Sequence, residues 1–151
     1  MTTVYDVPPE IFIERLAAKL KSADAIKPPE WARFVKTGSH REKAPVSSEW
    51  WFQRSAAVLR KIYVYGPVGT SRLAADFGGR RDRGSKPYNA VKGSRNITRT
   101  CLKQLQTQGL VEGKERRGRI VTAKGRALLD NTAHEVMLEL SNKRPELKKY
   151  L

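Results

Sequence analysis

The 151-residue sequence is poor in the residues that build redox and metal sites. It has one cysteine, Cys101, and two histidines, His40 and His134, and the three lie far apart along the chain. A single cysteine excludes an internal disulfide, and the spacing of the three residues excludes a typical zinc site. None of them has the pattern of an activated nucleophile. We therefore expect no catalytic residues, no metal ion and no cofactor.

Long apolar stretches are also missing. No run approaches the roughly 18 residues that would suggest a membrane span, and the first nine residues lack the basic-then-apolar pattern of a secretion signal. Hydrophobic residues still make up 39% of the chain, which with three tryptophans is enough for one core. A length of 151 residues suits one domain better than two. We expect a soluble, intracellular, folded protein.

Acidic residues are scarce relative to basic ones. The chain has 15 Asp and Glu against 30 Lys and Arg, a formal net charge of +15. Residues 79–119 carry +9 of this charge, whereas residues 1–50 carry +1, residues 51–78 carry +3 and residues 120–151 carry +2. A localised excess indicates a binding face for a polyanion. Nucleic acid is the first interpretation, and an acidic membrane surface is the second.

Apolar periodicity and turn residues predict a mainly α protein. Helices are expected over residues 9–22, 48–65, 70–77 and 94–108 and from Thr122 onward, and a hairpin over residues 110–122. Ser47 or Ser48, Ser94 and Thr122 are the expected helix caps. Residues 23–47, with a short helical piece near 31–35, and residues 78–93 are expected to be loops.

This order of elements predicts a winged helix-turn-helix core with extra N-terminal and C-terminal helices and one β-hairpin. The expected division is one domain, with an N-terminal helix and loop at 1–47, the winged-helix core at 48–141 and a tail at 142–151.

The helix expected at 94–108 has two chemically distinct faces. Apolar residues recur every four positions from Ile97 and are expected to face the core, and cations recur at the same interval on the opposite side: Arg95, Arg99 and Lys103. The hairpin turn adds a second group of cations: Lys114, Arg116, Arg117 and Arg119. The basic loop before the helix is too long for the short turn of a duplex-reading motif, and therefore favours an irregular RNA surface.

Other interpretations of the same residues stay open. The charged helix face is also compatible with a simple solvated surface, and the winged helix with a DNA-binding regulator. Asp76 and Asp82 are candidate magnesium ligands of a nuclease, although both stand among arginines without an acidic companion. The three tryptophans are candidates for base stacking, but aromatic side chains are more often buried: Trp31, Trp50 and Trp51.

Several short motifs together resemble one known family. They are Pro28-Pro29-Glu30-Trp31, Phe34-Val35-Lys36-Thr37-Gly38, His40, Trp51 to Arg54 with Arg60, Gly66-Pro67-Val68-Gly69, Gly78-Gly79-Arg80, Arg83-Gly84, and Gly118-Arg119 followed by Thr122 and Gly125. The sequence is similar over its whole length to ribosomal protein nineteen of the small subunit, the e-type of archaea and eukaryotes. Its ending at 145–150 and its Pro-Pro-Glu-Trp motif resemble the archaeal members.

The resemblance implies a winged-helix protein in the head of the small ribosomal subunit, bound to ribosomal RNA beside other ribosomal proteins. It also implies a cytoplasmic location, a role in maturation of the small subunit and no catalytic activity, membrane or small-molecule substrate. The stretch 85–93 departs from the family pattern. Family positions and neighbouring cations of the basic segment together form what we call the predicted RNA-binding set: Lys36, Arg41, Arg54, Arg60, Arg80, Arg81, Arg83, Lys86, Lys92, Arg95, Arg99, Lys103, Arg116, Arg117 and Arg119.

Overall fold

A computed structural model describes residues 2–23 and 26–150. Within them the chain is mainly helical, as predicted, and adds two separate two-stranded antiparallel sheets. The elements follow in this order: α1 Pro9–Ser22, η1 Glu30–Arg33, α2 Trp50–Tyr65, α3 Thr70–Asp76, β1 Gly79–Arg83, β2 Lys86–Val91, α4 Arg95–Thr107, β3 Val111–Lys114, β4 Gly118–Val121, α5 Ala123–Lys143 and η2 Pro145–Tyr150.

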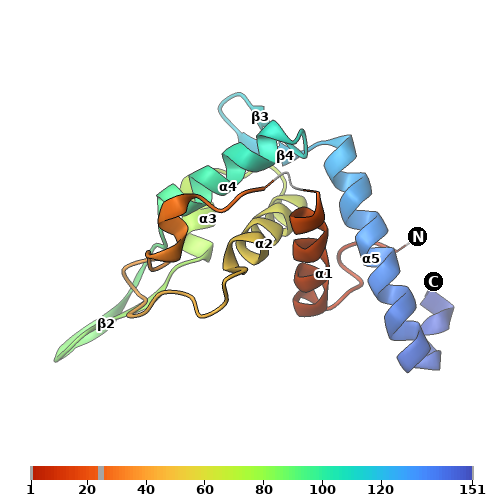
Figure 1. Ribbon diagram of the computed structural model, residues 1–151, viewed down its shortest axis with the longest axis horizontal. Helices are drawn as coiled ribbons and strands as arrows, with labels where there is room; N and C mark the ends of the chain where they lie inside the picture. Colours follow the sequence, from red (N-terminus) through yellow and green to blue (C-terminus); the bar gives the residue numbers. More distant parts are fainter. Residues whose placement is uncertain (1, 24–25, 151) are drawn as a thin grey trace.

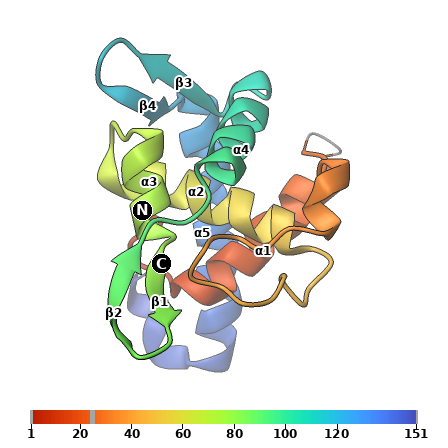
Figure 2. The same cartoon turned by 90° about the vertical axis from the view of Figure 1, so that its left-hand side faces the viewer.

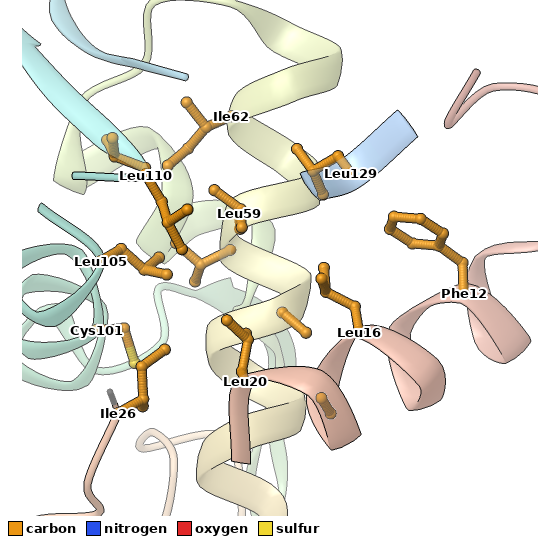
Figure 3. Packing of buried hydrophobic residues seen from close by; sticks show 14 of the residues in the cluster. Phe12, Leu16, Leu20, Ile26, Leu59, Ile62, Cys101, Leu105, Leu110 and Leu129 are labelled. Atoms are coloured by element: carbon orange, nitrogen blue, oxygen red, sulfur yellow. The ribbon is translucent and has the colours of Figure 1, made fainter. Parts of the chain in front are cut away.

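Helix α2 lies at the centre of the molecule. Helices α1 and α4 both pack against it, and α5 packs against α1. The apolar stripe of α2, including Leu59 and Ile62, meets Leu16 of α1, Leu105 of α4 and Leu129 of α5 in one continuous core (Figure 3). All five of these side chains are at most 1% exposed. This core holds the helices that carry the charged surface.

Two of the three expected helix caps are present. The hydroxyl oxygen of Ser94 accepts a hydrogen bond from the amide of Ile97 at 3.4 Å, and that of Thr122 accepts one from Gly125 at 3.1 Å. The expected serine cap of α2 is wrong. The helix begins at Trp50, and the Ser47 hydroxyl instead accepts from the Glu49 amide at 3.2 Å. That bond closes a turn before the helix begins.

The expected loop at 78–93 is also wrong, because β1 and β2 form a second hairpin there. Arg80 pairs with Ala90 and Arg81 with Asn89, and a register shift then brings Arg83 opposite Lys86. The turn consists of two residues, 84 and 85, and Gly84 has a φ of 71°, which favours glycine. The prediction of a single hairpin failed because this segment is rich in charge and poor in typical strand residues.

The predicted hairpin at 110–122 is confirmed as β3 and β4. Val111 pairs with Val121 and is 1% exposed, so the start of the hairpin belongs to the core. The outer strand is held on its other side by Val68, which exchanges two backbone hydrogen bonds of 3.1 and 3.0 Å with Arg119. Val68, β4 and β3 thus lie side by side, and this contact attaches the hairpin to the segment between α2 and α3.

The two ends of the molecule differ in construction. The β1–β2 hairpin projects from one end of the long axis, and α5 lies at the other end (Figure 1).

In the described residues no helix is both long and apolar enough to cross a membrane.

Candidate nucleic-acid interface

Exposed cations concentrate on three consecutive elements. These are the β1–β2 hairpin, the outer face of α4 and the turn of the β3–β4 hairpin. Helix α4 begins just after β2 and ends just before β3, so that it joins the two hairpins (Figure 2). We call the exposed cations of these elements the cationic surface: Arg80, Arg81, Arg83, Lys86, Arg95, Arg99, Lys103, Lys114, Arg116 and Arg117.

The two faces of α4 separate as the sequence predicts. Ile97 and Leu105 are buried at 2% and 0% exposure, whereas the three cations of the helix are exposed. At four-residue intervals, successive cations rise about 6 Å along the helix axis. The helix therefore presents a row of positive charge while its other face is fixed in the core.

The β1–β2 hairpin has cations on both of its faces. Every residue from 80 to 90 is exposed. Residues paired directly across a ladder share a face. The register therefore puts Arg81, Arg83 and Lys86 on one face and Arg80 on the other. Arg83 is partly engaged within the hairpin, since its Nη2 and Nε donate to the Pro87 carbonyl at 2.8 and 3.2 Å.

The cations of the β3–β4 hairpin differ in exposure. Lys114, Arg116 and Arg117 lie exposed around the turn. Arg119 lies instead in β4, half-buried, with its backbone paired to Val68 and its Nε covered and without a hydrogen-bond partner. Arg119 therefore lies in the strand, opposite Gly113 and one pair from the turn, and is not one of the exposed cations of the turn.

No member of the predicted RNA-binding set is neutralised by an ion pair within residues 2–23 and 26–150. The ion pairs of the structure lie elsewhere, at Arg15–Glu139, Lys19–Glu135, Lys21–Glu49 and Lys61–Asp76. Three of these pairs join α1 to α5 or to the residue before α2. The positive charge of the set is thus available to an external anion.

Five members of the set, besides Arg119, lie outside the three elements that define the cationic surface, although Lys92 is exposed between β2 and α4. Lys92 donates to the Ser71 hydroxyl at 3.0 Å, and Lys36 is exposed on the loop before α2. Arg60 is half-buried on α2 with its Nε covered. Arg41 and Arg54 line a cavity that the sequence did not predict. The set is therefore not one continuous row of side chains.

This cavity has a volume of about 780 Å³ and lies between α1, α2, the loop before α2 and Phe77. Burial, with a smaller contribution from Arg41, lowers the pKa of the half-buried Arg54 guanidinium, which remains charged at neutral pH. Burial and the charges of Arg41 and Arg54 lower the pKa of His40, so its imidazole is neutral at pH 7. The positive charge of the cavity therefore comes from arginine and lysine.

The structure bears on two alternative roles considered above: base stacking by a tryptophan and metal binding by two aspartates. Trp51 is fully buried, and its Nε1 donates to Gln104 at 2.9 Å, so it is not available to a base. Asp76 pairs with Lys61 at 3.4 Å, and Asp82 accepts from the Gly84 amide at 2.8 Å. The described residues contain no group of three or more potential metal ligands.

Comparison with known proteins identifies the family of the chain. The family described as Ribosomal protein S19e matches residues 3–139. Proteins named small ribosomal subunit protein eS19 match almost end to end. The one from Thermoplasma volcanium is 42% identical over 100% of both chains, and the one from Haloarcula marismortui is 46% identical over 99% of both. The rice protein of that name is 37% identical over 89% of this chain and 92% of its own.

The two archaeal proteins are thus more similar to this chain than the rice protein is. The family match and the alignments with these relatives each cover nearly all of the chain, including the helices of the core and both hairpins. The chain belongs to the ribosomal protein S19e family, in its archaeal type, a family of ribosomal proteins and not of enzymes.

Proposed function

We propose that this structural component of the small ribosomal subunit binds small-subunit ribosomal RNA through its cationic surface. The observation that carries the proposal is a run of ten exposed cations on three consecutive elements, none of them ion-paired in the part of the chain that the structure describes. Lysine and arginine side chains of this kind neutralise phosphates, which supplies most of the affinity for a nucleic acid.

The arrangement of α2, α3 and α4 with the β3–β4 hairpin supports a winged helix-turn-helix interpretation. Helices α2 and α3 both pack against α4, and the hairpin follows α4 directly in the position of a wing. The β1–β2 hairpin stands between α3 and α4, where a duplex-reading protein has a short turn. This insertion favours an irregular RNA surface over a DNA groove.

We infer that the chain acts as one domain. The N-terminal part at 1–47, the winged-helix core at 48–141 and the tail at 142–151 are its expected divisions, and apolar residues from Val4 to Met137 share one core. The expected partners are ribosomal RNA and neighbouring proteins of the subunit head, with a role in maturation of the subunit. The expected location is the ribosome in the cytoplasm.

Sedimentation with ribosomal subunits tests the proposal. A variant with alanine at Arg80, Arg83, Arg95 and Arg99 is expected to disappear from the small-subunit fractions of a sucrose gradient. Its circular dichroism spectrum and unfolding midpoint are expected to stay unchanged, because all four side chains are exposed. A control variant loses the same charge from the C-terminal end of α5 and from η2, through alanine at Lys143, Arg144, Lys148 and Lys149. Normal sedimentation of the first variant would overturn the proposal.

A further inference from the structure

Two cations of α2 contact the same aromatic ring but differ in their partners. The Arg54 guanidinium lies 4.3 Å from the centroid of Phe77, and the Lys61 ammonium lies 5.4 Å from it. Lys61 has a carboxylate partner, Asp76, at 3.4 Å. Arg54 has no acidic partner within residues 2–23 and 26–150. Partial burial of a charge without a counter-charge is unfavourable, which leaves Arg54 suited to an anion from outside.

The cavity beside Arg54 has the size and chemistry for more than a single phosphate. Its volume of about 780 Å³ falls within the range of roughly 300–1,000 Å³ of ligand pockets. Arg41, Lys43 and Arg54 supply three cations against one carboxylate, Glu42. A second part of the wall is apolar, formed by Ile13, Trp50, Ala57 and Phe77. Cations beside an apolar wall match a nucleotide, which has a phosphate at one end and a base at the other.

The cavity adjoins the base of the β1–β2 hairpin. His40 lines the cavity, and its ring lies between Gly38 and Gly79, the first residue of β1. A Cβ atom would stand 2.7 Å from its Nδ1 at Gly38 and 3.1 Å from its Cδ2 at Gly79. The backbone of the hairpin base is therefore in direct contact with the cavity wall. An RNA strand bound along the hairpin would therefore pass close to the cavity wall at His40.

We propose that this cavity receives one unpaired nucleotide of the bound ribosomal RNA, with its phosphate on Arg54 and Arg41 and its base against the apolar wall. The inference rests on the proposed function and adds to it a position where one unpaired base of the RNA is held. Proteins that recognise RNA commonly take up unstacked bases on aromatic side chains or guanidinium planes.

Three α2 variants test the assignment. Binding of the full chain to a small-subunit ribosomal RNA transcript is measured for Arg54→Met, for the control Lys61→Met and for Ala57→Leu, which narrows the cavity without changing charge. Arg54→Met is expected to weaken binding about tenfold and to reduce the salt slope by about one, as for one lost phosphate contact. Lys61→Met is expected to change neither. Ala57→Leu is expected to weaken binding with an unchanged salt slope.

Chemical probing of the RNA in the same complexes identifies the nucleotide. One single-stranded nucleotide is expected to be protected by the wild type and by Lys61→Met and to become reactive with Arg54→Met and Ala57→Leu. Thermal unfolding of each variant confirms that the chain is folded before its binding is interpreted.

The possible outcomes separate the two proposals. Failure of the wild type to bind the transcript overturns RNA binding itself. Normal binding by all three variants leaves RNA binding intact and overturns the cavity assignment.

Discussion

The two hairpins of this protein share a topology but not a means of support. The β3–β4 hairpin begins at a buried valine, and its outer strand is bonded to Val68 on the body. The β1–β2 hairpin has no buried residue between 80 and 90. An isolated two-stranded hairpin is only marginally stable in water. The comparison indicates that β3–β4 is part of the fold, whereas β1–β2 is held by its own turn and by its base.

This difference means that the residues that stabilise the fold and the residues of the proposed binding surface are largely different ones. Side chains that contribute to the core are absent from the projecting hairpin, so its residues are free to serve a partner. The β3–β4 hairpin has an anchored base, which belongs to the fold, and a cationic turn, which belongs to the proposed binding surface. Variants of the two hairpins are therefore expected to have different consequences.

The largest expected effect follows excision of the projecting hairpin. Gly79 and Val91 are paired across the ladder, so two glycines can replace residues 80–90. Removal of four cations is expected to weaken binding to ribosomal RNA by roughly 10²–10³-fold at physiological salt. The free energy of unfolding in urea is expected to stay within about 0.5 kcal/mol of the wild type, since no core contact is lost. A substantial loss of stability would show that the hairpin belongs to the fold.

A smaller effect distinguishes two glycines with positive φ. At Gly118, φ is 102°, and a Cβ would lie 2.5 Å from the Val68 carbonyl oxygen. Gly118→Ala is expected to lower the free energy of unfolding by about 2 kcal/mol, from backbone strain and displacement of β4. The measurement is urea denaturation followed by the fluorescence of the buried tryptophans.

Gly84→Ala is the matched control in the other hairpin. Gly84 has a φ of 71°, but a Cβ there meets no atom within 4 Å. Its strain is confined to a turn that opens without disturbing the core, so the global free energy of unfolding is expected to change by less than about 0.5 kcal/mol. Equal losses in the two glycine variants would contradict the distinction between the hairpins.

The smallest expected effect concerns backbone protection. In the free protein, amides of β1 and β2 are expected to exchange with solvent at least about tenfold faster than those of β3 and β4, because only the latter hairpin is tied to the core. Bound ribosomal RNA is expected to slow exchange in β1 and β2 and to change β3 little. Hydrogen exchange with mass spectrometry measures both rates. Equal protection in the free protein would mean that the projecting hairpin is stabilised internally.

The helices were predictable because local chemistry and periodicity agree in them. In α4, a serine cap, apolar residues every four positions and cations on the other side all indicate the same helix, and the structure has it. The serine cap predicted for α2 is absent, because the Ser47 hydroxyl bonds within the turn before the helix. Where two neighbouring serines could each cap a helix, the packing of the helix decides at which residue it begins, and the residues before it do not.

The β1–β2 hairpin had one sequence signal, the dipeptide Gly84-Ser85 in a two-residue turn. Neither strand alternates apolar and polar residues, because neither has a buried face. The cavity had no such signal. Its wall combines Ile13, His40, Arg54 and Phe77 from four separated segments, and only tertiary packing brings them together.

Net positive charge is higher toward the projecting hairpin than at the α5 end of the long axis, where residues 120–151 carry only +2. Cations of α1 face glutamates of α5, as in Lys19–Glu135, whereas residues 79–119 keep a net charge of +9. The molecule therefore has an electric dipole, with its positive pole toward the projecting hairpin (Figure 1). In the field of a polyanion such a dipole experiences a torque, so the protein is turned before contact and the hairpin arrives first. Few collisions are then lost to wrong orientations, and added salt slows the encounter as well as weakening the complex.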